Sequence, residues 1–130
     1  MLPEYRFELL VHPLADESRG VVINDYKAQI FKDNKIAEEV SIRPRSKEVF
    51  LEILKYLNIQ NWNNDYTCED SVFDGFYWKL TFESKESCFT SSGFNAYPDT
   101  KNASDGSTKI NIIAIALDSL IEKKHLAFIL

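Results

Sequence analysis

The chain has 130 residues and a mass of 15.0 kDa, enough to close one hydrophobic core without disulfide or metal staples, so we expect a single domain over residues 1–130. Charged residues make up 27% and aromatic residues 13% of the sequence, which favours a globular protein with strands over a plain helical bundle. No apolar run approaches the roughly 20 residues of a membrane span, and the N-terminal segment lacks the features of a signal peptide. We therefore expect a cytoplasmic protein.

The net charge is −5, from 15 basic and 20 acidic residues, and the acidic excess is concentrated in one segment. Residues 65–74 contain four acids and no base, whereas the rest of the chain has 16 acids against 15 bases. The four acids are Asp65, Glu69, Asp70 and Asp74. A concentrated negative surface disfavours nucleic acids and anionic membranes and favours a basic protein partner.

The N-terminal part of the chain alternates between apolar and polar residues in the manner of strands. A first strand is predicted over residues 5–11. A second covers residues 21–31, with either a bulge or a short reversal near Asn24. The Asp-Asn pair at residues 33–34 predicts a hairpin turn, because both residue types tolerate positive φ, and a third strand should follow and end before Pro44.

Two stretches show apolar residues at helical spacing. Residues 46–57 predict a helix with Ser46 as its N-cap, and residues 108–124 predict a second helix. Trp62 is expected to fold back onto the core after the first helix. The apolar tail, residues 125–130, should either prolong the second helix or dock against the sheet.

The central element is a hairpin within residues 74–98. Its first strand, residues 76–83, alternates strictly, and a polar reversal at residues 84–87 leads into a second strand over residues 88–92. Strands joined by short turns imply antiparallel pairing. The order of three strands, a helix, two or three strands and a helix predicts an α+β fold, with an antiparallel sheet of about five to six strands and both helices on one face.

Two short sequences frame this hairpin, DGFYWKL at residues 74–80 and SSGFNAYP at residues 91–98. They resemble a pattern in small bacterial proteins without an assigned activity, DGxxWxL followed by SxGxNAYP and a closing helix. The resemblance covers residues 62–122, and the polar insertion at residues 100–107 departs from it. It implies a bacterial or phage origin and the same order of elements, and it implies no chemistry.

Residues typical of catalysis are sparse. The two histidines, His12 and His125, border apolar segments near opposite ends of the chain, and we interpret both as structural or surface residues. The sequence contains no nucleophile elbow, zinc, P-loop or dinucleotide motif. The acids of residues 65–74 could form a catalytic carboxylate pair or hold a hard cation, but a solvated or docking surface is the favoured interpretation. We expect no cofactor and no metal.

The cysteines and the basic residues also form no recognisable motif. Cys68 and Cys88 lack metal-ligand spacing and are interpreted as buried reduced thiols, with a disulfide between them left open. Arg43, Arg45 and Lys47 are interpreted as the solvated start of the first helix, so we expect no nucleic-acid binding.

These features fit a non-enzymatic acidic binding protein best. An immunity protein that neutralises a basic, nuclease-like bacterial toxin would have this size and charge, because an acidic patch speeds association with a cationic partner. The residues expected to contact the partner are the four acids and nearby aromatic side chains. They are Trp62, Asp65, Tyr66, Glu69, Asp70, Asp74 and Tyr77.

Two other classes of function stay open. A small enzyme or ligand-binding domain could have its site near Asp74, Asn95 and Tyr97, although turn geometry is the favoured role of these residues. A subunit of a larger phage or cell-envelope assembly would expose an apolar patch near residues 128–130. A deep pocket would favour a ligand site, and a flat charged surface would favour the acidic binding protein. The sequence leaves the oligomeric state open.

Overall fold

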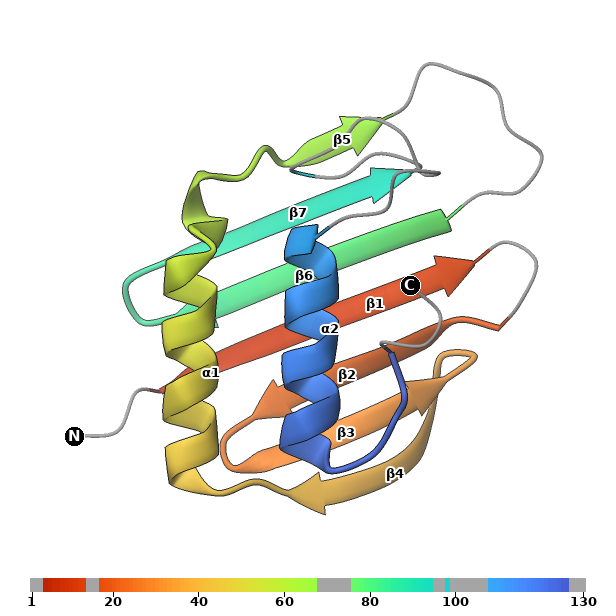
Figure 1. Cartoon of the computed structure of the whole chain (residues 1–130), viewed down its shortest axis with the longest axis vertical. Helices are drawn as coiled ribbons and strands as arrows, with labels where there is room; N and C mark the ends of the chain where they lie inside the picture. Colours follow the sequence, from red (N-terminus) through yellow and green to blue (C-terminus); the bar gives the residue numbers. More distant parts are fainter. Residues whose placement is uncertain (1–3, 14–16, 68–75, 95–97, 99–107, 127–130) are drawn as a thin grey trace.

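The computed structural model describes residues 4–13, 17–67, 76–94, 98 and 108–126, and it shows one sheet with two helices packed against it (Figure 1). Seven strands lie in the order β4-β3-β2-β1-β6-β7-β5. The strands are β1 (Tyr5–Pro13), β2 (Arg19–Asn24), β3 (Lys27–Lys32), β4 (Lys35–Ser41), β5 (Asp65–Thr67), β6 (Phe76–Ser84) and β7 (Cys88–Phe94). The helices are α1 (Pro44–Tyr56), the short 3-10 helix η1 (Ile59–Asn61) and α2 (Thr108–Ile121).

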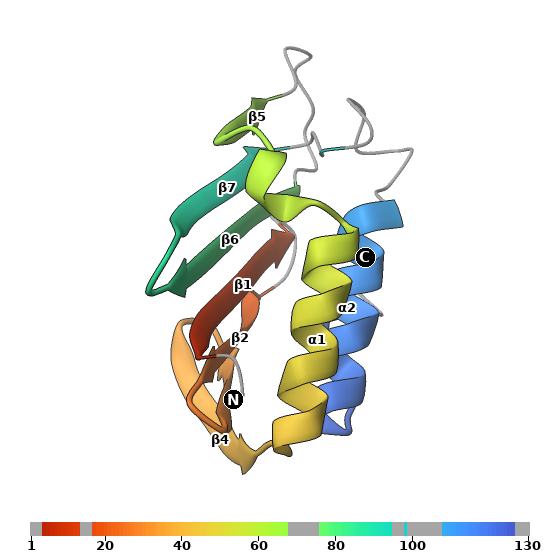
Figure 2. The same cartoon turned by 90° about the vertical axis from the view of Figure 1, so that its left-hand side faces the viewer.

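The predicted α+β fold is confirmed. The sheet is antiparallel except for the β5–β7 pair, and Figure 2 shows α1 and α2 together on one side of it. The sheet has seven strands instead of five or six, because residues 21–31 form two strands joined at Asp25, whose φ is 53°, and β5 adds a short strand at the edge. The predicted turn between β3 and β4 also forms, with positive φ at Asp33 and Asn34.

The pairing of β1 with β6 joins the two halves of the sheet. It extends over nine residue pairs, from Tyr5 opposite Ser84 to Pro13 opposite Phe76. Alternate side chains of both strands face the helices and are fully buried, as the strict alternation predicts. These side chains are Phe7, Leu9, Val11, Trp78 and Leu80.

Helix α1 begins at Pro44, and Arg43 is its N-cap without a side-chain capping hydrogen bond. The predicted N-cap at Ser46 is wrong, because proline is already suited to the first helical turn: its φ is fixed near the helical value and it has no N–H to satisfy. The helix packs on the sheet through Phe50, whose ring meets that of Phe7 edge-on at 5.0 Å and 76°.

Lys47 of α1 is buried, with only 2% of its surface exposed, so its predicted place in a solvated helix start is wrong. Its ammonium group donates a hydrogen bond to the carbonyl oxygen of Asp25 at 2.6 Å and lies 4.8 Å and 5.1 Å from the ring centroids of Tyr5 and Tyr26. Burial lowers the pKa of Lys47. The contact fastens α1 to the turn between β2 and β3.

The chain after α2 docks against the sheet. The helix ends three residues earlier than predicted, because Glu122 adopts a left-handed φ of 60°. The Asp118 carboxylate then accepts the backbone N–H groups of His125 and Leu126 at 3.0 Å and 2.9 Å. The His125 ring nitrogen Nε2 lies 3.1 Å from the carbonyl oxygen of Phe31 on β3. Docking, rather than a longer helix, is thus confirmed as far as Leu126, and residues 127–130 lie outside the described part.

Cys88 is an exposed free thiol at the start of β7, so the predicted burial is wrong for this residue. It is paired with Glu83 in the register, on the face of the sheet that points away from the helices. Cys68 lies outside the described residues. In the part of the chain that the structure describes, neither helix has the length and apolar character that a membrane crossing requires.

Replacing Trp78 by alanine should lower the free energy of unfolding by about 3–5 kcal/mol, because it opens a cavity beneath the helices. Urea denaturation measures this loss. Tyr56→Ala is the matched control: its ring is 84% exposed, and its removal should change stability by less than about 0.5 kcal/mol. Equal losses in the two variants would contradict the assignment of Trp78 to the core.

Candidate functional site

The predicted contact residues Trp62 and Tyr66 pack on the helix-covered face of the sheet. The Trp62 indole N–H donates to the carbonyl oxygen of Leu57 at 3.1 Å, and its ring meets Trp78 edge-on at 6.2 Å. Trp62 therefore folds back onto the core, as predicted. The Tyr66 ring lies 6.0 Å from Trp78, and its hydroxyl accepts the backbone N–H of Asn63 at 2.9 Å. By packing against Trp78, both aromatic side chains stabilise the β5 end of the sheet.

The other contact residues lie elsewhere or outside the described part. Tyr77 precedes the buried Trp78 on β6, so it lies on the face opposite Trp62 and Tyr66. Asp65 is exposed on β5, at the edge of the sheet. Glu69, Asp70 and Asp74 lie outside the described residues, as do Asn95 and Tyr97 of the alternative ligand site and residues 128–130 of the alternative assembly patch.

An open cleft of about 980 Å³ lies between α1 and the turn end of the β6–β7 hairpin. One wall comes from α1 and η1, and the other from the sheet, where β1, β6 and β7 each contribute one aromatic ring. The apolar lining consists of Tyr5, Leu51, Leu54, Ile59, Phe82 and Phe89. Figure 1 shows the hairpin turn and α1 on the same side of the molecule, and Figure 2 shows the sheet and the helices from that side.

The three rings of the sheet wall form a stacked row. Phe82 and Phe89 are opposite one another in the register, with ring centroids 5.2 Å apart and an interplanar angle of 17°. Tyr5 and Phe82 stack at 5.5 Å and 18°. These spacings are close to the distance between neighbouring strands, so the rings stand upright on the sheet with their faces against each other. Their edges therefore point across the cleft towards α1.

The buried and half-buried polar groups of the lining are already hydrogen-bonded within the chain. The Tyr5 hydroxyl donates to the carbonyl oxygen of Lys47 at 2.7 Å, and burial raises the pKa of Tyr5 well above its usual range, so the phenol stays neutral. The Ser84 hydroxyl accepts the backbone N–H groups of Glu86 and Ser87 at 3.3 Å and 3.2 Å. Among the described lining residues, every buried side-chain nitrogen or oxygen has a partner.

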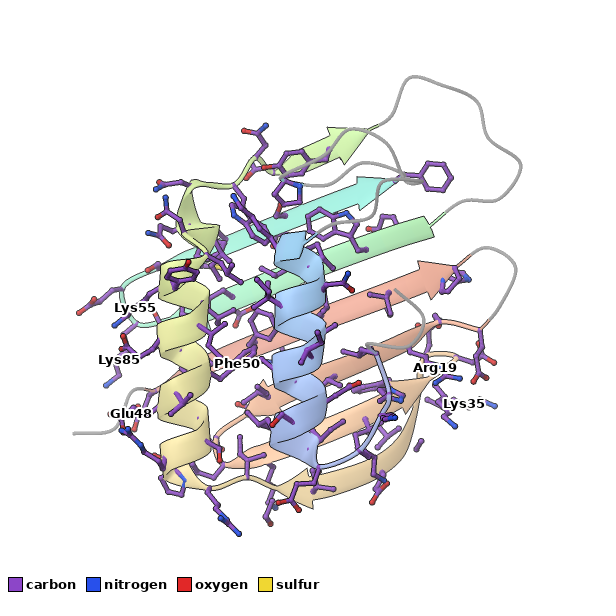
Figure 3. All side chains as sticks on the ribbon, in the orientation of Figure 1. Arg19, Lys35, Glu48, Phe50, Lys55 and Lys85 are labelled. Carbon is purple, nitrogen blue, oxygen red and sulfur yellow. The ribbon has the colours of Figure 1, made fainter. Side chains whose placement is uncertain are left out.

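Charged side chains surround the mouth of the cleft. Lys55 extends from α1, where it lies 3.6 Å from Glu52, and Lys85 extends from the hairpin turn. Figure 3 shows the two lysines on the same side of the molecule. Glu4 and Glu86 also line the cleft, so the rim carries both signs of charge in equal number.

This cleft was not foreseen from the sequence. The alternation along residues 5–11 and 76–83 indicates that Tyr5 and Phe82 face inward, but it does not indicate that they stack on each other or on Phe89. Of the three rings, Phe89 is half-buried, whereas Tyr5 and Phe82 are only 5% and 8% exposed. In the described residues, no three His, Cys, Asp or Glu side chains are placed to hold a metal ion.

No protein-family model matches the chain. The curated proteins likewise contain no significant match to its sequence. The functional conclusion therefore depends on the cleft and on the distribution of charge.

The two histidines lie apart from the cleft. His12 is half-buried on β1, opposite Tyr77, and His125 is 3% exposed beneath the end of α2. Burial lowers the pKa of His125, against the opposing effect of hydrogen bonding to the carbonyl groups of Phe31 and Gly20. Its surroundings match the structural role predicted from the sequence.

The lowered pKa of His125 makes stability pH-dependent. In the unfolded chain the imidazole of His125 is protonated near pH 6.5, whereas in the folded chain it is protonated only at a lower pH. The contribution of neutral His125 to the free energy of unfolding is therefore fully present above about pH 6.5 and falls as the pH drops towards the folded pKa. The stability advantage of the wild type over His125→Gln should therefore shrink between pH 7.5 and pH 5.5 in urea denaturation. An advantage that stays constant or grows on acidification would contradict this prediction.

Proposed function

We propose that the protein is a non-enzymatic binding protein and that the cleft between α1 and the β6–β7 hairpin is its binding site. The observation that carries the proposal is an open cleft of about 980 Å³ with an apolar lining built on three stacked rings. Binding sites for organic ligands are typically concave, mostly apolar and largely preformed, with volumes of roughly 300–1,000 Å³. In this proposal the protein binds its ligand or partner in the cytoplasm.

The lining favours binding over catalysis. Its floor consists of aromatic and aliphatic side chains, its inner polar groups are used for hydrogen bonds within the chain, and its charges are at the rim. A catalytic site needs a polar group that is free to act on a substrate at its centre. The apolar area that the cleft offers lies mainly at the half-buried Leu51 and Phe89, and its burial contributes roughly 25 cal/mol per Å².

The neutral dye Nile red should bind the folded protein saturably, with one dye per cleft, because its flat apolar body fits an apolar slot. Leu51→Trp should weaken binding roughly tenfold, since the larger ring fills the space between the two walls. Ile115→Trp on α2 is the matched control: Ile115 is 58% exposed outside the cleft, and its replacement should leave dye affinity unchanged. Fluorescence titration measures all three affinities, and equal affinity in the two variants would refute the assignment.

A second candidate is the immunity protein that neutralises a basic toxin. The observation that favours it is the group of four acids without a base in residues 65–74, which begins with Asp65 exposed at the sheet edge. Such a segment would attract a cationic protein and repel the nucleic acid that a nuclease binds. The contact residues proposed are those expected from the sequence, with Trp62 and Tyr66 holding the strand from which the acidic segment departs.

Neutralising the acidic segment should abolish capture of a basic partner. The variant Asp65→Asn, Glu69→Gln, Asp70→Asn and Asp74→Asn is immobilised beside the wild type and exposed to lysate of the source organism. A basic protein held at low salt and released at high salt should be lost in this variant, because the interaction is electrostatic. A control removes four exposed acids elsewhere: Glu39, Glu52, Glu83 and Glu122, each replaced by glutamine. Retention of the same protein by the segment variant would rule the candidate out.

A further inference from the structure

We propose that the protein forms a two-fold symmetric dimer in which the outward face of α2 packs antiparallel against the same face of a second copy. This face, the α2 stripe, consists of Ile112, Ile115, Ala116 and Ser119. None of the described α2 residues lines the cleft, so the stripe is a separate surface. The inference therefore does not depend on the proposed function of the cleft.

The α2 stripe is apolar although it lies on the side of the helix away from the sheet. Ile115 is 58% exposed, and Ile112 and Ala116 are half-buried. A helix at the surface usually has charged residues on this side, as α1 has with the exposed Arg45 and Glu52. The side of α2 that packs on the sheet is formed by other residues, all buried: Ile110, Ile113, Ala114, Leu117 and Ile121. An apolar stripe that recurs at helical spacing on the exposed side marks a contact surface.

Charged residues border the α2 stripe only at its two ends. Lys109 precedes it by one helical turn, and Glu122 follows it by one turn. The one charged residue between them, Asp118, is buried, and its carboxylate accepts backbone N–H groups of the segment after the helix. A partner that fits this surface therefore has an uncharged centre, an acid at one end and a base at the other.

A second copy of α2 meets these requirements when it runs antiparallel. With the two-fold axis between Ile115 and Ala116, Ile115 of each copy lies at the height of the partner's Ala116. Ile112 likewise lies at the height of the partner's Ser119. Large side chains are then beside small ones, which lets the ridges of one helix enter the grooves of the other. Lys109 lies at the height of the partner's Glu122, so both ends of the stripe bring opposite charges together.

The rest of the helical layer also suits a second copy. Figure 1 shows α1 beside α2 on the same face of the sheet, so the charged residues of α1 would flank the α2 stripe. An apolar centre with a polar rim is the usual anatomy of a protein–protein interface. A membrane surface is a poorer occupant, because membrane-surface helices are flanked by Lys and Arg, whereas Glu52 and Glu122 are exposed here and the net charge is −5.

Sedimentation equilibrium of the full chain tests the dimer. The wild-type mass should rise with concentration towards twice the 15.0 kDa of one chain. Ile115→Glu should raise the dissociation constant at least about tenfold, because it buries two carboxylates against apolar side chains beside the axis. Ile36→Glu is the matched control: Ile36 is 56% exposed on the edge strand β4, and its replacement should leave the dissociation constant unchanged.

Charge reversal tests the antiparallel register. Lys109→Glu and Glu122→Lys should each weaken self-association, because like charges then face each other at both ends of the stripe. An equimolar mixture of these two variants should form a mixed dimer with the affinity of the wild type, since every end again pairs an acid with a base.

Three results would overturn the inference. One is a wild type that stays monomeric at millimolar concentration. The second is an equal effect of Ile36→Glu and Ile115→Glu, which would place the contact outside the α2 stripe. The third is a mixture of Lys109→Glu and Glu122→Lys that associates no more tightly than either variant alone, which would exclude the antiparallel pairing.

Discussion

The pairing of β1 with β6 is the constraint on which the rest of the structure depends. It brings Tyr5 opposite Ser84, residues far apart in the chain, and joins the N-terminal strands to the C-terminal hairpin in one sheet. Closing so long a loop costs entropy, which the burial of five side chains of these two strands under the helices offsets. The same pairing brings Tyr5 beside Phe82, so the row of rings in the cleft is a direct consequence of how the sheet is closed.

Two buried basic side chains fasten the helical layer to that sheet. Lys47 of α1 and His125 after α2 each hydrogen-bond to a backbone carbonyl of the N-terminal strands or their turn, at Asp25 and Phe31. Burial disfavours the charged form of both, as their lowered pKa values indicate. Because a hydrogen bond is directional where apolar packing is not, these contacts restrict how the helices lie on the sheet. They hold the β2–β3 side closely, while the cleft opens on the β6–β7 side.

The two proposed sites, the cleft and the acidic segment, are compatible with each other. Apolar anchors in a pocket slow dissociation, whereas a surface charge mainly speeds encounter with a partner of opposite sign. Trp62 and Tyr66, which the sequence suggested as contact residues, pack with Trp78 and hold the edge of the sheet in place. Of the three rings in the cleft wall, Tyr5 and Phe82 belong to the core and Phe89 is half-buried.

The sequence by itself determined the class of fold, the helix-covered faces of β1 and β6, and the return of Trp62 to the core, because these follow from local periodicity and turn chemistry. It misplaced Lys47 and the start of α1, since burial of a lysine depends on a distant carbonyl group and two rings. Strand order, the parallel β5–β7 pair and the cleft were decided only by the tertiary structure. The physical reason is that each joins residues far apart in the chain, and no local pattern encodes which strands meet or where two layers fail to close.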